Sequence, residues 1–141
     1  MLDAYRDLID ELLDTPNAIR GTIDAQGEGD IPEDARRLIA GLRDRDRAVL
    51  SRVQTMTRQE TPYLPSLKLD EPSADEPLSA LLEAMETARG DLVSLLINLS
   101  LKDWERRANH ETEGEISLSD EIEQHVEFDE EQRQRLQELM V

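Results

Sequence analysis

The sequence predicts an all-α protein, a four-helix bundle with a long crossover between the second and third long helices. Apolar residues recur at three- and four-residue spacing in four segments, which is the period of amphipathic helices. Only 3% of the 141 residues are aromatic, so Leu, Ile, Val, Met and Ala must fill the core. Such residues favour helix packing over a β-sandwich, which is rich in β-branched and aromatic residues. A chain of this length suits one domain, residues 1–141.

The first helical segment begins near the N-terminus. Its apolar stripe consists of Leu2, Tyr5, Leu8, Ile9, Leu12 and Leu13. Thr15 and Pro16 follow, and this pair is typical of a helix cap with Pro at the first position of a new helix. We therefore expect a short second helix that continues through Ile23. A single kinked helix is the alternative.

The next helix begins after Pro32, with acidic residues in its first turn, where the helix dipole favours them. Its apolar stripe consists of Ala35, Leu38, Ile39, Leu42, Val49, Leu50, Val53 and Met56. Asp46 is in phase with this stripe, so we expect its carboxylate to point partly inward. Arginines crowd the rest of this helix, and we interpret them as a solvated face paired with neighbouring acids.

Residues 57–77 contain four prolines, which exclude a continuous helix. Apolar residues between the prolines indicate a segment held across the bundle, and we expect a plain crossover rather than a catalytic lid. The third long helix begins at Pro77 and has the strongest apolar periodicity in the chain, which ends at Leu99.

The last quarter of the chain places Trp104 near a helix end, followed by a polar crossing with His110 and Gly114. We expect His110 to hydrogen-bond the backbone of this loop. Ser117 and Asp120 have the spacing of a capping box at the start of a helix. The stripe of this last helix consists of Leu118, Ile122, Val126, Asp129, Leu136 and Met140.

The charge balance limits the partners that the protein can bind. A net charge of −17 disfavours nucleic acid and anionic membranes, because both need a positive face. The absence of cysteine excludes disulfides and thiolate zinc sites. No apolar run approaches the roughly 20 residues that span a bilayer. Because no signal peptide is visible either, we expect an acidic, cytoplasmic protein.

Three parts of the chain resemble the DinB-like superfamily of four-helix bundles. They are the helix DARRLIAGLRDRDRAVLSRV, the crossing from Asp103 to Leu118, and the last helix. The resemblance implies the bundle fold, and we expect a homodimer. Many members of this family hold a divalent metal through one His of the second helix and two His one turn apart on the last helix.

The family's ligand positions are altered in this chain. An alignment without a gap puts them at Gly41, Gln124 and Phe128, none of which is a good transition-metal ligand. We therefore predict a degenerate metal site and no cofactor. A one-residue shift instead puts His125 and Asp129 at i and i+4 on one helix face, with Asp46 or Asp44 as a third ligand.

Two functions follow from these two alignments. The first is a metal-free DinB-like protein, a binding or stress-related member, with a small-molecule pocket between the second and last helices. The second is an enzyme similar to the family's thiol-dependent S-transferases, with nickel or zinc held by His125, Asp129 and Asp46. The candidate pocket residues are Gly41, Asp44, Asp46, Gln124, His125, Phe128, Asp129 and Trp104.

Other chemistries fit the sequence poorly. Two histidines cannot form a three-His site. Ser117 and Ser119 are typical of helix caps rather than nucleophiles. The di-iron motif requires Glu-x-x-His, and the glutamates near His125 miss that spacing. A partner that binds the proline-rich segment 57–77 is a third hypothesis.

Overall fold

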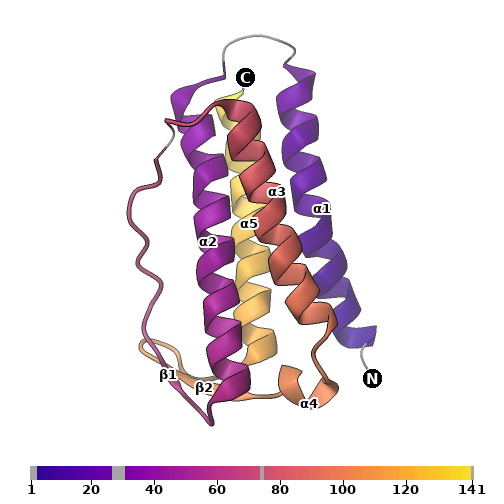
Figure 1. Cartoon of the computed structure of the whole chain (residues 1–141), viewed down its shortest axis with the longest axis vertical. Helices are drawn as coiled ribbons and strands as arrows, with labels where there is room; N and C mark the ends of the chain where they lie inside the picture. The colour runs from indigo at the N-terminus through magenta and orange to yellow at the C-terminus, as the bar shows by residue number, and fades with distance from the viewer. Residues whose placement is uncertain (1–2, 27–30, 74, 141) are drawn as a thin grey trace.

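The computed structural model describes residues 3–26, 31–73 and 75–140 and shows four long helices side by side (Figure 1). The elements in chain order are α1 (Asp3–Ala25), α2 (Glu33–Arg58), β1 (Tyr63–Leu64), α3 (Leu78–Ile97), α4 (Leu101–Trp104), β2 (Arg107–His110), β3 (Gly114–Ser117) and α5 (Leu118–Leu139). α1 packs against α3 and α5, and α2 packs against the same two helices. α1 and α2 therefore lie on a diagonal of the bundle. The predicted four-helix bundle is confirmed.

In the described ranges, no helix is both long enough and apolar enough to cross a membrane.

α1 continues through Pro16, so the predicted cap at Thr15 is wrong and the single-helix alternative is correct. Proline has no N–H, and the carbonyl four residues earlier, that of Leu12, therefore lacks its helical donor. Nη1 of Arg89, on α3, donates to this carbonyl oxygen at 2.7 Å. A side chain from a neighbouring helix thus satisfies the acceptor that the proline leaves free.

A small three-stranded sheet lies at one end of the bundle, and the all-α prediction did not include it (Figure 1). β2 and β3 form an antiparallel hairpin in which Ala108 lies opposite Ile116. β1 adds a parallel strand from the crossover, with Tyr63 opposite Asn109. Four-residue strands give a weak periodic signal, which explains why the sequence did not reveal them.

The hairpin turn confirms the expectation for His110. Its Nδ1 accepts hydrogen bonds from the backbone N–H groups of Thr112 at 3.2 Å and Glu113 at 3.3 Å. Gly114 ends the turn with a φ of 75°, a conformation that residues with a side chain rarely adopt.

The crossover runs beside α2 (Figure 1), and arginines of α2 bond to it. Arg52 donates to the carbonyl oxygen of Pro65, and Arg36 donates to that of Glu76. Arg37 and Arg43 form looser ion pairs with Glu71 and Glu76, at 3.5 and 3.6 Å. The arginines of α2 therefore pair with the crossover as well as with acids of their own helix. The expectation that they form a solvated face is wrong for Arg43 and Arg52, which are buried.

The core consists of two apolar clusters with a polar level between them. The cluster nearer the sheet includes Leu12, Val49, Leu92, Trp104 and Ile122. The other cluster includes Ile19, Leu42, Met85 and Leu136. Between them, each long helix contributes a buried polar residue that is in phase with its apolar stripe: Thr15, Asp46, Arg89 and Asp129.

α5 begins at the predicted capping box, which the structure confirms. Oγ of Ser117 accepts from the Asp120 N–H at 3.1 Å, and Oδ2 of Asp120 accepts from the Ser117 N–H at 2.9 Å. We expect Ser117→Ala to lower the free energy of unfolding by about 1 kcal/mol, measured by urea denaturation. Ser94→Ala, at an exposed site of α3, is the control and should change it by less than about 0.5 kcal/mol. Equal effects of the two substitutions would contradict the capping role.

Candidate functional site: a buried ionic layer

Five polar residues form one continuous group at the middle of the bundle, and we call them the ionic layer. They are Thr15 of α1, Asp46 of α2, Arg89 of α3, and His125 and Asp129 of α5. Each is at most 2% exposed to solvent. Buried charges are costly unless they are paired and hydrogen-bonded, so their arrangement decides what the layer can do.

Arg89 lies at the centre of the ionic layer and contacts all three other long helices. Nη1 and Nη2 donate to the two oxygens of Asp129 at 2.7 and 2.8 Å, which is a bidentate pair. Nε donates to Oδ1 of Asp46 at 3.0 Å, and Nη1 also reaches the Leu12 carbonyl oxygen. Burial by itself lowers the pKa of Arg89, but the hydrogen bonds to Asp129 and the charge of Asp46 outweigh it and raise the pKa. The guanidinium is a permanent cation.

The hydrogen bonds of His125 assign its tautomer. Nε of Arg45 donates to Nδ1 of His125 at 3.1 Å, so Nδ1 carries no proton. Nε2 therefore carries the proton and donates to Oδ1 of Asp46 at 2.7 Å. Both ring nitrogens are engaged, and the imidazole is neutral.

The charges of the layer and its neighbour Arg45 balance. Asp46 and Asp129 carry two negative charges, and Arg89 and Arg45 carry two positive ones. Burial lowers the pKa of Arg45, while the negative charge of Glu121 opposes this effect. An arginine still stays protonated in proteins. The Arg45 guanidinium also lies over the ring of Phe128, with its carbon 4.4 Å from the ring centroid.

Two further sets of polar contacts join the long helices, and the one through Thr15 continues the ionic layer. Arg52 of α2 forms a bidentate pair with Glu121 of α5, at 2.6 and 3.2 Å. Oγ1 of Thr15 donates to Oδ2 of Asp129 at 2.9 Å and accepts from Nη2 of Arg133 at 2.6 Å. No buried side-chain polar atom in the described part of the chain is without a hydrogen-bond partner.

The residues of the ionic layer do not fit a metal ion. His125, Asp129 and Asp46 do come together, as the shifted alignment requires, but the guanidinium of Arg89 lies between the two carboxylates. The nitrogen of His125 that faces the layer carries a proton and is bonded to Asp46. Among the described residues, no group of three or more His, Cys, Asp or Glu side chains is arranged to hold a metal.

The gapless alignment leads to a different part of the structure. Gly41 and Phe128 line one pocket of about 330 Å³ between α2, α5 and the crossover. Gln124 lies outside this pocket lining and donates to a carboxylate oxygen of Glu113 in the hairpin. None of these three residues offers a metal an imidazole or a carboxylate.

The two remaining candidates lie apart from both the layer and this pocket. The Asp44 carboxylate accepts from Nε of the adjacent Arg43 at 2.9 Å. Trp104 is fully buried and stacks on Tyr5, with ring centroids 4.6 Å apart, in the apolar cluster nearer the sheet. Trp104 is therefore a core residue and not part of a pocket.

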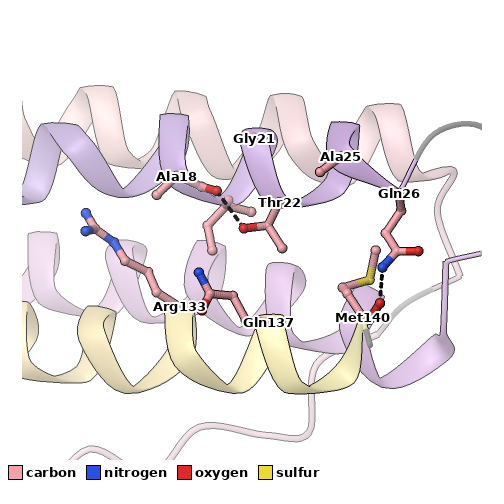
Figure 2. A pocket seen from close by; sticks show the side chains of 9 residues that line it. Ala18, Gly21, Thr22, Ala25, Gln26, Arg133, Gln137 and Met140 are labelled. Carbon is pink, nitrogen blue, oxygen red and sulfur yellow. Dashed lines mark hydrogen bonds between the residues drawn. The ribbon is translucent and has the colours of Figure 1, made fainter.

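A larger hollow of about 690 Å³ lies between α1 and α5, toward the end of the bundle away from the sheet (Figure 2). On α1 its lining includes Ala18, Gly21 and Ala25, whose small side chains leave the helix surface open. Arg133 of α5 belongs to this lining and also donates to Thr15, so the hollow adjoins the ionic layer.

The sequence pattern predicts Asp46, His125 and Asp129 as site candidates, whereas it does not point to Arg89 or Thr15 as members of the site. A signal for Arg89 was present, since it lies four residues after Met85 and three before Leu92, in the apolar stripe of its helix. Thr15 was interpreted as a cap because of the following proline. An inward arginine is the natural partner of two inward carboxylates, but only the packing of the helices shows that they meet.

Comparisons with known proteins identify the fold. No family model matches the chain, and no curated protein sequence matches it significantly. One solved structure with a similar fold is that of YfiT from Bacillus subtilis, described as "a probable metal-dependent hydrolase with an unusual four-helix bundle topology". It aligns over 95% of this chain and 84% of its own, with a TM-score of 0.76 and 19% sequence identity.

The chain has the YfiT fold. At this low identity the likeness shows the fold and not the activity. The predicted resemblance to DinB-like bundles is therefore confirmed as a fold. At the level of the ionic layer, the side chains of this chain bring an arginine between the two aspartates.

We expect Arg89→Met to lower the free energy of unfolding by roughly 3–5 kcal/mol, because it leaves two buried carboxylates without their counter-charge. Urea or thermal denaturation measures the change. Arg20→Met is the matched control, since Arg20 pairs with Glu86 at the surface, and it should cost less than about 1 kcal/mol. Similar losses in both variants would show that the ionic layer does not depend on Arg89.

Proposed function

We propose that this protein is a DinB-like four-helix bundle that works without a metal, as a small-molecule binding protein. One observation supports this proposal: the guanidinium of Arg89 supplies the positive charge between Asp46 and Asp129. The alternative, a thiol-dependent transferase, needs a divalent ion that presents a thiolate.

Electrostatics explains why Arg89 and a metal would exclude each other in this layer. A divalent ion held by Asp46 and Asp129 would lie within a few ångströms of the guanidinium, and like charges at such distances repel strongly when they are buried. The metal would also have to displace the proton of His125 and the bidentate Asp129 pair. The ion would thus replace a set of contacts that is already complete.

The binding role rests on the pocket between α2, α5 and the crossover. Its volume of about 330 Å³ lies at the small end of the range for ligand sites, roughly 300–1,000 Å³. Its lining combines apolar side chains with charged ones, as ligand sites commonly do. The cytoplasmic location and the stress-related role expected from the sequence stay predictions.

We expect the purified protein to contain no stoichiometric nickel, zinc or iron by elemental analysis. We also expect a chelator to leave its melting temperature unchanged, because a metal bound only to the folded state would otherwise stabilise it. Near-stoichiometric metal that disappears in His125→Ala would contradict the proposal and favour the transferase. Gln124→Ala is the control, since Gln124 lies on the same helix but outside the ionic layer.

The expected homodimer also stays a prediction. Size-exclusion chromatography with light scattering would measure the mass in solution, and we expect twice the chain mass of 16.1 kDa. A monomer at micromolar concentration would contradict it. The hollow between α1 and α5 (Figure 2) is the surface to test first, and Gly21→Glu would add a charged side chain there.

A further inference from the structure

We propose that the pocket between α2, α5 and the crossover binds a small zwitterion with an apolar side chain, of the α-amino-acid class. This inference rests on the binding role proposed above and adds the chemical class of the ligand. Three features carry it: an apolar floor, a glycine in the lining that adds no side chain to the pocket, and a rim with unpaired charges of both signs.

The floor of the pocket is apolar and held in position by its surroundings. Leu38 and Phe128 line it, and Phe128 is fixed by the Arg45 guanidinium at 4.4 Å and by the stacked ring of His125, 6.3 Å away between centroids. Pro72 of the crossover forms a wall. An aliphatic or aromatic side chain of a ligand would bury its surface against these groups.

Gly41 leaves room for that side chain. A Cβ built on Gly41 would meet only one atom within 4 Å outside its own helix turn, Cγ of Pro72 at 3.6 Å. Position 41 therefore lies within van der Waals range of the Pro72 wall, and a large side chain there would fill the pocket between α2 and the crossover. The position that the gapless alignment assigns to a metal ligand is thus a side-chain-free part of the pocket lining.

The rim carries two positive and two negative groups, but only one pair is formed across it. Arg37 bonds Glu33 of its own helix at 3.0 Å and faces Glu71 of the crossover at 3.5 Å. Asp34 of α2 and Arg135 of α5 also line the pocket. Within the described ranges, neither of these two has an ion-pair or hydrogen-bond partner in the protein, so each is available to a ligand.

A zwitterion satisfies this rim better than a simple anion or cation. Its carboxylate can approach Arg135 while its ammonium approaches Asp34, so the charges of ligand and rim both balance. The chain has a net charge of −17, which repels anions at long range, whereas a neutral zwitterion escapes that repulsion. The pocket volume of about 330 Å³ suits a molecule of amino-acid size.

The test is a titration of isotope-labelled full-length protein with L-leucine, followed by NMR. We expect saturable shifts of the amide signals of Gly41 and Phe128 at millimolar ligand. N-acetyl-L-leucine lacks the ammonium and L-leucinamide lacks the carboxylate. Each should bind at least about tenfold more weakly than L-leucine, because each loses one charged contact with the rim. Binding of either derivative as tight as that of L-leucine, or no saturable shift with L-leucine, would overturn the inference.

Variants locate the binding site. Arg135→Gln and Asp34→Asn should each weaken L-leucine binding about tenfold, and Gly41→Leu should abolish it by filling the pocket. Arg20→Gln changes a surface pair between α1 and α3 and should bind normally. If Arg135→Gln, Asp34→Asn and Gly41→Leu all bind as the unaltered protein does, the ligand lies elsewhere and the inference is wrong.

Metal content, measured on the same sample, separates the two proposals. If the protein contains no metal and does not bind L-leucine, only the proposed class of ligand is refuted. A protein with stoichiometric metal that His125→Ala removes refutes the proposed metal-free role, whatever it binds. Thermal denaturation of each variant confirms that it is folded before its binding is compared.

Discussion

The guanidinium of Arg89 is the group on which the arrangement of the bundle depends. It is buried, and its donors reach Asp46, Asp129 and the Leu12 carbonyl, so it contacts α2, α5 and α1 at one level. The Leu12 carbonyl is free because Pro16 has no N–H to offer it. Arg89 therefore supplies the hydrogen bond that Pro16 cannot give to the Leu12 carbonyl, and α1 remains continuous.

Such a layer contributes more to the choice of structure than to net stability. Removing charges from water is costly, and well-packed apolar residues are often at least as stabilising as a buried ion pair. A polar layer, however, penalises any register in which its members fail to meet, as a single polar residue does in a coiled coil. We infer that the ionic layer aligns the four helices, because each of them contributes at least one of its members.

The fold that this chain shares with YfiT does not decide its chemistry, which depends on its own side chains. The structural neighbour is described as a probable metal-dependent hydrolase. Here the carboxylates of the ionic layer are paired with a cation that belongs to the protein, and both nitrogens of His125 are engaged. The pocket lined by Gly41 and Phe128 lies on the side of α5 that also carries Arg135. Any ligand there meets an apolar floor and charged rim groups rather than an ion.

The sequence by itself determined the four-helix bundle, the crossover, the capping box at Ser117 and the inward direction of Asp46. Helical periodicity and local hydrogen-bond patterns depend on neighbouring residues, which is why the sequence shows them. It did not determine the path of α1 through Pro16, because the donor to the Leu12 carbonyl, Arg89, lies far away in the chain. It did not reveal the strands either, because segments of at most four residues carry little periodic signal. Only the tertiary structure decided that Asp46, His125 and Asp129 surround Arg89. The reason is physical: each helix specifies which of its faces is buried, but the partner of a buried charge is set by how the helices pack.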